Sequence, residues 1–476
     1  MNKTSCRMGR MCGFLTIILF AALLSGCDKA DSDTVTLRIC NWEEYIDEGD
    51  WDEDEAIELD DGTRIIGQNS LVEDFEEWYF ETYGVRVKVE YSTFGTNEEL
   101  YNQITIGDVY DLVCPSEYMI MKMMREGMLE PYSEDFSDAG KAGNYYSKGV
   151  SPYIRGVFDN LSINGERLDK YAAGYMWGTL GIVYNPDEIT DEEAKHWNIL
   201  LNKDYYRRIT IKDSVRDAYF AAIAIDYFDE ITDPVIKNSP DYNRRLSEML
   251  NRTDPDTVKE VEEILIRAKD NVYSFETDSG KADMVTGKVI ANEQWSGDAV
   301  YTLDQAEEDG FMLRYSAPEE GTNLWFDGWV MLKAGISEDA AKKQAAEAFV
   351  NFLSRPENAV RNMYYIGYTS VISGGDSDVI FDYINYNYAA EDEEDAVGYD
   401  DIGYFFEDDS EDANEKYTVI TTKDQTKRQL YAQYPPKSVV DRSVVMACFD
   451  DESNERINRS WTNVRCFDLK KLFGRK

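Results

Sequence analysis

Histidine is nearly absent from this chain, which has one, His196, among 476 residues. A zinc site built from several histidines is therefore excluded, and a Ser-His-Asp or Cys-His catalytic triad is disfavoured. His196 follows a polar, acidic stretch, so we expect it to lie exposed on a helix. The composition favours a function that needs no imidazole and no metal.

Basic residues are also scarce, with 49 Lys and Arg against 93 Asp and Glu and a net charge of −44. A surface this acidic repels nucleic acid and anionic lipid headgroups and attracts cations. We therefore expect no nucleic-acid partner and no anionic ligand.

The chain has one long apolar run, Phe14 to Leu24, which is shorter than the roughly 18 residues that a transmembrane helix needs. Lysine and arginine precede it, as in a secretory signal. The run closes with Leu24-Ser25-Gly26-Cys27, which is similar to the bacterial lipobox, whose cysteine is diacylated. We predict a lipoprotein signal peptide at 1–26, lipid attachment at Cys27 and a tether at 27–34; a cleaved signal with an incidental cysteine is the alternative.

Cysteine is sparse after Cys27, and no C-x-x-C pair occurs. Cys40 and Cys114 end two predicted strands that could be neighbours, and export would permit a bridge between them. Buried free thiols are the favoured interpretation for these two residues, and the sequence does not settle the pairing of Cys448 and Cys466.

Strand and helix patterns alternate along the chain. Strands are predicted at 35–42, 85–91, 110–114, 180–184 and 208–211, and helices at 70–83, 117–127, from 217, from 255, 337–354 and 357–365. Such alternation implies βαβ units and mostly parallel sheets, arranged as two α/β lobes. Two acidic runs, 47–61 and 391–413, are predicted to be solvated loops, with calcium sites or docking surfaces as alternatives.

Aromatic residues stand beside acids at three predicted strand ends: Asn41-Trp42-Glu43-Glu44-Tyr45, Trp295-Ser296-Gly297-Asp298 and Trp325-Phe326-Asp327. In open α/β sheets, ligands bind at the carboxyl ends of strands. A buried ammonium needs a carboxylate, and tryptophan faces add cation–π attraction and cover methylene groups. These three segments suit a polyamine, although composition alone does not choose between a polyamine and a sugar.

A set of short motifs, in order along the chain, resembles the putrescine/spermidine-binding proteins of ABC importers over nearly all of residues 35–470. Besides the three segments above, the matching stretches are Val89-Glu90-Tyr91-Ser92-Thr93, Tyr110 to Tyr118, Gly174-Tyr175-Met176-Trp177-Gly178, Asp213-Ser214-Val215-Arg216-Asp217, Asn351 to Pro356 and Ile366-Gly367-Tyr368. The resemblance implies a type II periplasmic-binding-protein fold with the ligand in the cleft between two lobes. It places lobe 1 at 35–176 and 328–375 and lobe 2 at 177–327 and 376–476, each a mostly parallel sheet flanked by helices.

The resemblance also implies roles for individual residues. An aromatic box would be formed by Trp42, Tyr45, Trp295, Trp325 and Tyr368. Hydrogen bonds would come from Ser116 and Tyr118, and ammonium groups would pair with Glu44, Asp217, Asp298 and Asp327.

Two departures from the family pattern bear on the ligand. Ser214 stands where spermidine-binding relatives often carry an acid, and Asp298 stands where they carry a small residue. Because an acid at the latter position is typical of putrescine-preferring relatives, we lean towards putrescine. Glu43 replaces a smaller residue and could shorten or recharge one end of the site.

The resemblance thus implies a lipid-anchored, extracytoplasmic binding subunit that delivers a polyamine to a permease and its ATPase, without a cofactor and without catalysis. A binding protein of the same fold for another small solute is the nearer alternative. A secreted acidic glycosidase is the more distant one, since paired carboxylates beside aromatics also suit sugar hydrolysis. Sensing of a polyamine for a signalling partner is a third.

Overall fold

The computed structural model describes residues 34–336, 338–391 and 396–466. The predicted signal peptide and Cys27 lie outside the described residues. Within the described part of the chain, no helix is both long enough and apolar enough to cross a membrane.

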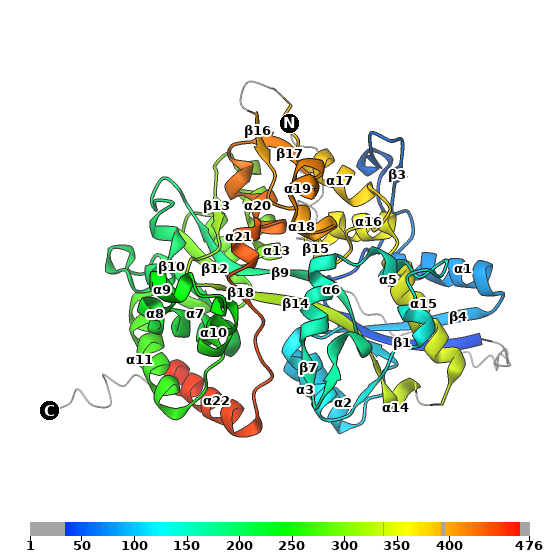
Figure 1. Ribbon diagram of the computed structural model, residues 1–476, viewed down its shortest axis with the longest axis horizontal. Coiled ribbons are helices and arrows are strands. Elements are labelled where there is room, and N and C mark those ends of the chain that lie inside the picture. The colour runs from blue at the N-terminus through cyan, green and yellow to red at the C-terminus, as the bar shows by residue number, and fades with distance from the viewer. Residues whose placement is uncertain (1–33, 337, 392–395, 467–476) are drawn as a thin grey trace, which may run out of the picture.

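A single twisted sheet runs through the molecule in the order β11-β10-β12-β9-β14-β5-β1-β4 (Figure 1). Its main strands are β1 (Thr34–Trp42), β4 (Arg86–Phe94), β5 (Leu112–Val113), β9 (Ala172–Tyr184), β10 (Ile209–Lys212), β11 (Ser274–Glu276), β12 (Ala291–Trp295) and β14 (Thr322–Leu332). Four short strands pair with β9 or β14: β6 (Leu129–Glu130), β13 (Arg314–Ser316), β15 (Thr369–Ser370) and β18 (Ser443–Val444).

The two long strands β9 and β14 join the two lobes. At one end of the sheet β1 is parallel to β4 and β5, and at the other β10 is parallel to β11 and β12. Between them, β9 is antiparallel to β14 and β12. The predicted α/β fold with parallel outer strands is confirmed, whereas the antiparallel centre was not predicted because only residues 180–184 of β9 read as a strand.

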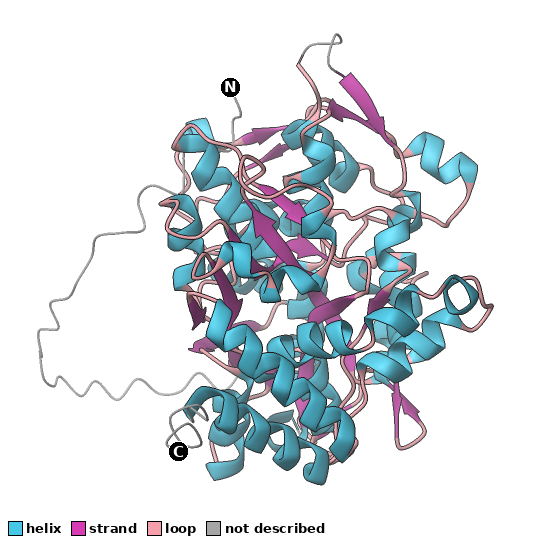
Figure 2. Ribbon diagram, turned by 90° about the vertical axis from the view of Figure 1, so that its left-hand side faces the viewer, coloured by secondary structure: helices cyan, strands magenta, loops and turns pink. Residues whose placement is uncertain are grey.

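Helices flank the strands on both sides (Figure 2). The helices within the predicted lobe 1 include α1 (Leu71–Tyr83), α2 (Asn97–Ile106), α3 (Glu117–Arg125), α6 (Pro152–Asn160), α15 (Ala340–Leu353) and α16 (Pro356–Ile366). Those within the predicted lobe 2 include α7 (Val215–Asp226), α8 (Phe228–Thr232), α10 (Tyr242–Leu250), α11 (Pro255–Asn271), α12 (Ser279–Val285), α13 (Ser296–Glu308) and α22 (Asp451–Cys466). The sequence predicted several of these ends: Ser70 caps α1 in a capping box with Glu73, and Gly84 ends it at φ 70°.

The segment after β15 forms a group of short elements at the top of Figure 1. It comprises α17 (Val379–Tyr388), β16 (Ala396–Tyr399), α18 (Gly403–Phe406), α19 (Glu411–Lys416), β17 (Val419–Thr422), α20 (Gln429–Gln433) and α21 (Lys437–Val440). Tyr383, Phe405 and Tyr434 share one hydrophobic core with Ile154 of α6 and Val360 of α16, while α20 packs on α13. The segment therefore contacts both lobes, and the lobe boundaries given above stay predictions.

The first acidic run is not the solvated loop that was predicted. It folds back as a small hairpin, β2 (Ile57–Glu58) and β3 (Arg64–Ile65), and buries Trp51. Asp47 is fully buried; it accepts a hydrogen bond from the Trp51 indole at 2.6 Å and pairs with Arg361 of α16 at 2.9 Å. The second run also departs from the prediction, because α18 buries its aromatic residues; residues 392–395 lie outside the described part. No group of three or more metal-ligating side chains occurs in the described ranges.

The cysteines and the histidine can now be placed. Cys40 and Cys114 are buried free thiols, as expected, whereas Cys448 is half-buried and Cys466 is exposed. His196 is not an exposed helical residue. Its Nδ1 lies 3.0 Å from the fully buried Glu320 carboxylate, and its ring packs edge-on against Phe228 at 5.7 Å.

Candidate functional site

The predicted site residues gather where β14 crosses from one lobe to the other. Trp325 pairs with Gly178 of β9, and the register then shifts between Phe326 and Gly328. Such bulges re-aim a side chain out of the regular alternation. Here the irregular residue is Asp327, which makes an isolated bridge to Ser116 at the start of α3.

Asp327 is a buried carboxylate held by two hydroxyl groups. Ser116 donates to its Oδ1 at 2.7 Å and Tyr45 donates to its Oδ2 at 2.8 Å. Burial raises the pKa of Asp327 to about 6, although both hydroxyl groups act to lower it. Among the described residues no Lys, Arg or His forms an ion pair with Asp327. A cation is thus the partner that this carboxylate lacks within the chain.

Three aromatic rings lie against each other beside this carboxylate. Tyr368 meets Tyr45 edge to face, with 5.2 Å between the ring centroids, and meets Trp325 at 5.7 Å. Two glycines leave room for the rings. A Cβ on Gly178 would lie 2.5 Å from the Trp325 indole, and one on Gly297 would lie 2.5 Å from the Tyr368 ring.

Asp298 lies on the opposite side of the site, in the first turn of α13. Tyr368 donates to its Oδ1 at 2.9 Å. Two lysines pair with it, Lys212 at 3.2 Å and Lys281 at 3.7 Å. Burial alone would raise the pKa of Asp298, but these two positive charges and the Tyr368 hydroxyl lower it below its ordinary value.

Asp217 lies in the first turn of α7, next to Trp295 at the end of β12. Burial raises its pKa, while the side chains of Ser214 and Trp295 act in the opposite direction. No ion pair of Asp217 occurs among the described residues. Asp217 thus forms no ion pair among the described residues, as Asp327 does not, but the nearby positive charges of Lys212 and Arg216 act to lower the pKa of Asp217 and not that of Asp327.

Glu117 is a site residue that the sequence analysis did not single out. It is 1% exposed, and its Oε2 has no hydrogen-bond partner. Burial raises its pKa to about 8, and the nearby charges of Asp327 and Asp217 add to the shift. The signal was present in the sequence, because Glu117 stands between Ser116 and Tyr118, two residues that were assigned to the site.

The remaining predicted residues are placed less centrally. Tyr118 reaches Asp327 indirectly: Asn97 donates to its hydroxyl and to the Ser116 Oγ, each at 3.1 Å. Trp42 packs on Phe94 at 4.6 Å between ring centroids. Glu44 is exposed, at φ 53°, and among the described residues no hydrogen bond or ion pair joins it to the buried carboxylates. The structure therefore does not bring Glu44 into the cluster.

Comparisons with known proteins show the family to which the chain belongs. The model of the family described as bacterial extracellular solute-binding protein matches residues 70–379. The spermidine/putrescine-binding periplasmic protein of Salmonella typhimurium is 27% identical over 355 residues, which is 74% of this chain and 82% of the relative. The putrescine-binding periplasmic protein PotF of Escherichia coli is 24% identical over 335 residues, covering 68% of this chain and 74% of the relative.

Two solved structures share the fold. One is the spermidine/putrescine ABC transporter substrate-binding protein PotD of Streptococcus pneumoniae, with a TM-score of 0.57, 24% identity, and coverage of 90% of this chain and 98% of that chain. The other is the TpPotD lipoprotein of Treponema pallidum, with a TM-score of 0.56, 18% identity, and coverage of 90% and 99%. The fold is thus the predicted type II periplasmic-binding-protein fold, and the chain belongs to the bacterial extracellular solute-binding protein family.

Proposed function

We propose that this chain is the extracytoplasmic subunit of an ABC importer that binds putrescine or spermidine. The observation that carries the proposal is Asp327, a buried carboxylate with two hydroxyl donors and no paired cation among the described residues, beside the rings of Tyr45, Trp325 and Tyr368. An isolated buried charge costs several kcal/mol, so a ligand that brings an ammonium group offsets that cost on binding. The names of the relatives support the same ligand class.

The chemistry of each group follows from its surroundings. Asp327 would pair with one ammonium group, and the Trp325 and Tyr368 rings would cover the adjoining methylene groups and add about 0.5 to 2 kcal/mol of cation–π attraction. Ser116 and Tyr45 would hold the carboxylate in place. Such a site binds and releases its ligand, and the proposal assigns the chain no catalytic step and no cofactor.

The test is calorimetric titration of residues 28–476 with putrescine, spermidine and butane-1,4-diol. Saturable binding of an amine with no binding of the diol is the expected result. Absence of binding to both amines by folded protein would refute the proposal. The alternative, a binding protein of the same fold for another small solute, would then be tested. Turnover of glycoside substrates by the same sample would favour the secreted glycosidase instead.

The proposal extends to closure of the two lobes on the ligand. Tyr45, Ser116 and Glu117 lie on one side of β14, whereas Asp217, Trp295 and Asp298 lie on the other, which supports lobes at 35–176 with 328–375 and at 177–327 with 376–476. Hinge motion about the crossing strands would then present a closed form to the permease and its ATPase. Small-angle scattering with and without the bound amine measures the expected compaction.

We also propose that Cys27 carries a lipid that anchors the chain to the cell membrane. The sequence Leu24-Ser25-Gly26-Cys27 supports this proposal, as does the description of the Treponema relative as a lipoprotein. Labelling with a radioactive fatty acid should mark the wild-type chain and not Cys27→Ser. Equal labelling of both chains would refute the anchor.

A further inference from the structure

Lys212 is a buried lysine inside the candidate site. It ends β10 and is 1% exposed. Its Nζ donates to the Thr277 carbonyl at 2.9 Å and to Asp298 Oδ2 at 3.2 Å, and it lies 4.5 Å from the centroid of the Trp295 ring. Lysine is almost never fully buried unless it is paired, so this side chain has a specific place in the interior.

The Lys212 ammonium group has the surroundings that the proposed function predicts for an ammonium group of the ligand. Two buried carboxylates, Asp298 at 3.2 Å and Glu276 at 3.9 Å, receive a positive charge at the end of a flexible four-carbon stem, together with a carbonyl oxygen and a tryptophan face. Putrescine is also an ammonium group on a four-carbon stem. Lys212 therefore presents Asp298 and Trp295 with the same chemical group that a polyamine would bring.

The ion pairs divide the carboxylates of the site into two kinds. Asp298 has two in-chain cations, Lys212 and Lys281. Asp327 and Asp217 have none among the described residues, and Glu117 lies close enough to both for their charges to raise its pKa. A further ammonium group at Asp298 would meet the like charge of Lys212 at an ion-pair distance. One at Asp327 would meet a carboxylate with no cation nearby, and one at Asp217 would meet a carboxylate that Lys212 and Arg216 influence without an ion pair.

We propose that Lys212 determines specificity by filling the ammonium position at Asp298 and Trp295 from within the chain, so that a bound polyamine pairs with Asp327 and Asp217 instead. This inference rests on the proposed function. It implies that the wild-type site takes a diammonium ligand and discriminates against a third ammonium group. Asp298 then contributes to binding through Tyr368 and not through direct contact with the ligand.

The test compares putrescine with spermidine in wild type and in Lys212→Met. Removal of the lysine charge should free Asp298 and shift the ratio of the two dissociation constants at least tenfold in favour of spermidine. The double variant Lys212→Met/Asp298→Asn loses both charges and should return the ratio to within about threefold of wild type. Lys259→Met is the control for loss of a lysine charge, because Lys259 is exposed on α11 and pairs with Glu263 at 3.7 Å, and it should leave the ratio unchanged.

The outcomes separate this inference from the proposed function. Failure of folded wild type to bind either amine would remove the proposed function and the inference together. Binding by wild type with the same ratio in Lys212→Met would overturn the inference alone. Should Lys212→Met not fold, a crystal structure of the wild-type putrescine complex decides the matter: Nζ of Lys212 at Asp298 supports the inference, and a ligand nitrogen in that place overturns it.

Discussion

Tyr45 and Tyr368 contact each other edge to face, 5.2 Å between centroids, while their hydroxyl groups donate to two different carboxylates, Asp327 and Asp298. One ring pair therefore connects an unpaired carboxylate with a carboxylate that already has cations. A change at one carboxylate that moves its tyrosine should therefore also shift the tyrosine that donates to the other carboxylate. The predictions below use this asymmetry.

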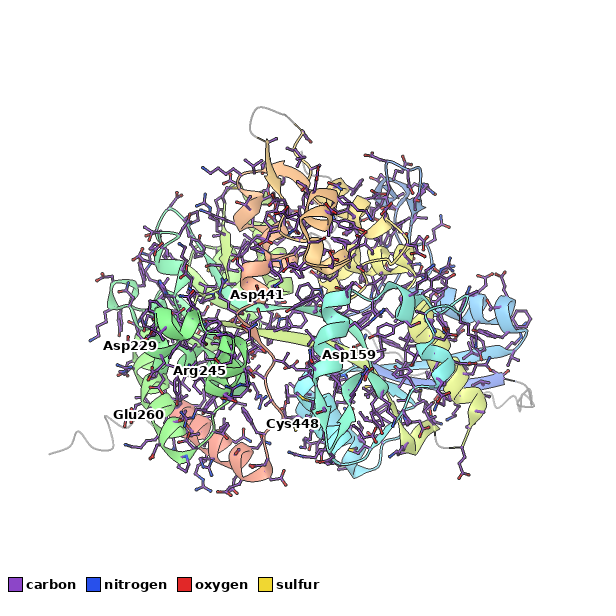
Figure 3. The ribbon with its side chains drawn as sticks, viewed as in Figure 1. Asp159, Asp229, Arg245, Glu260, Asp441 and Cys448 are labelled. Atoms are coloured by element: carbon purple, nitrogen blue, oxygen red, sulfur yellow. The ribbon has the colours of Figure 1, made fainter. Side chains whose placement is uncertain are left out.

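Asp327→Asn should weaken amine binding about 100-fold or more, because the ligand ammonium loses its charged partner. The free energy of unfolding should not fall, because an uncompensated buried charge is removed along with its desolvation cost. Calorimetry measures the first effect and thermal unfolding the second. Asp229→Asn is the matched control, since Asp229 is exposed on α8 at the outer side of lobe 2 (Figure 3). Unchanged affinity in Asp327→Asn would favour an uncharged ligand.

Amine affinity should fall as the pH drops through about 6. Burial raises the pKa of Asp327 to about 6, so acid neutralises the carboxylate that the ligand needs. A primary amine, with an ordinary pKa near 10, stays charged throughout. Titration of the dissociation constant from pH 5 to 8 measures the step, and Asp327→Asn should abolish it. A step that persists in this variant would have to come from another group.

The stability of the ligand-free protein should fall as the pH rises, whereas amine affinity should rise. The pKa values of Asp327, Glu117 and Glu293 are raised, to about 6, 8 and 8. The folded state therefore holds protons that the unfolded chain releases. The bound protons of these three groups stabilise the folded state fully below the ordinary carboxyl pKa. This stabilisation is lost as the pH rises through 6 for Asp327 and through 8 for the two glutamates. Each group contributes a slope of about 1.4 kcal/mol per pH unit while it is protonated only in the folded state.

Thermal unfolding at pH 5, 6, 7 and 8 without ligand checks this trend. Glu117→Gln should flatten the loss of stability between pH 6 and 8, because it removes one of the two groups with the largest shift. A steeper loss in Glu117→Gln than in wild type would contradict the assignment of that shift to Glu117.

Local signals in the sequence predicted much of this fold. Ser70 and Gly84 bounded one helix, and two of the aromatic-acid segments marked the ends of β1 and β12. The third, Trp325-Phe326-Asp327, was expected at a strand end and lies instead in the middle of β14. The full length of β9 was missed, because only residues 180–184 were predicted as a strand, and Gly178 lies in the part that was missed. In the structure Gly178 is required by a neighbour remote in sequence, the Trp325 indole, which no local pattern reports.

The site was predicted less completely than the fold, for a related reason. Lys212 precedes Asp213 and looks like a surface residue in the sequence, yet it is buried by an ion pair with Asp298, 86 residues away. Conversely, Glu44 stands in a matching motif, but the chain turns there at positive φ and leaves it exposed. Burial of a charge depends on tertiary partners, which spacing alone does not give.

Gly297→Ala should reduce both amine affinity and stability. The new Cβ would lie 2.5 Å from the Tyr368 ring, so Tyr368 would have to move away from Asp298 and Tyr45. We expect at least a tenfold loss of affinity and a lower unfolding temperature. Gly156→Ala is the control, because a Cβ at this α6 position meets nothing within 4 Å and should stabilise the helix by about 1 kcal/mol. Wild-type affinity in Gly297→Ala would mean that the Tyr368 position is not needed for binding.

Asp47→Asn should lower the free energy of unfolding by about 3 kcal/mol, because it breaks a buried ion pair with Arg361. Amine affinity should stay within about threefold, since the pair anchors the hairpin of β2 and β3 and not the carboxylate cluster. Denaturant unfolding measures the loss. The exposed Asp54→Asn, in the same acidic run, should change stability by less than about 0.5 kcal/mol. Equal stability of the two variants would show that the hairpin does not depend on Arg361.

The late position of two core segments has a consequence for how this chain folds. The core around α6 and α16 includes Tyr434 and Val440, and the core of lobe 2 includes Ile457 and Val464 of α22, which lies beside α11 in Figure 1. Neither core can close until nearly the whole chain has been synthesised, and the contacts that close them span hundreds of residues. Because loop-closure entropy must be overcome before such non-local contacts form, we expect these two cores to be completed late in folding.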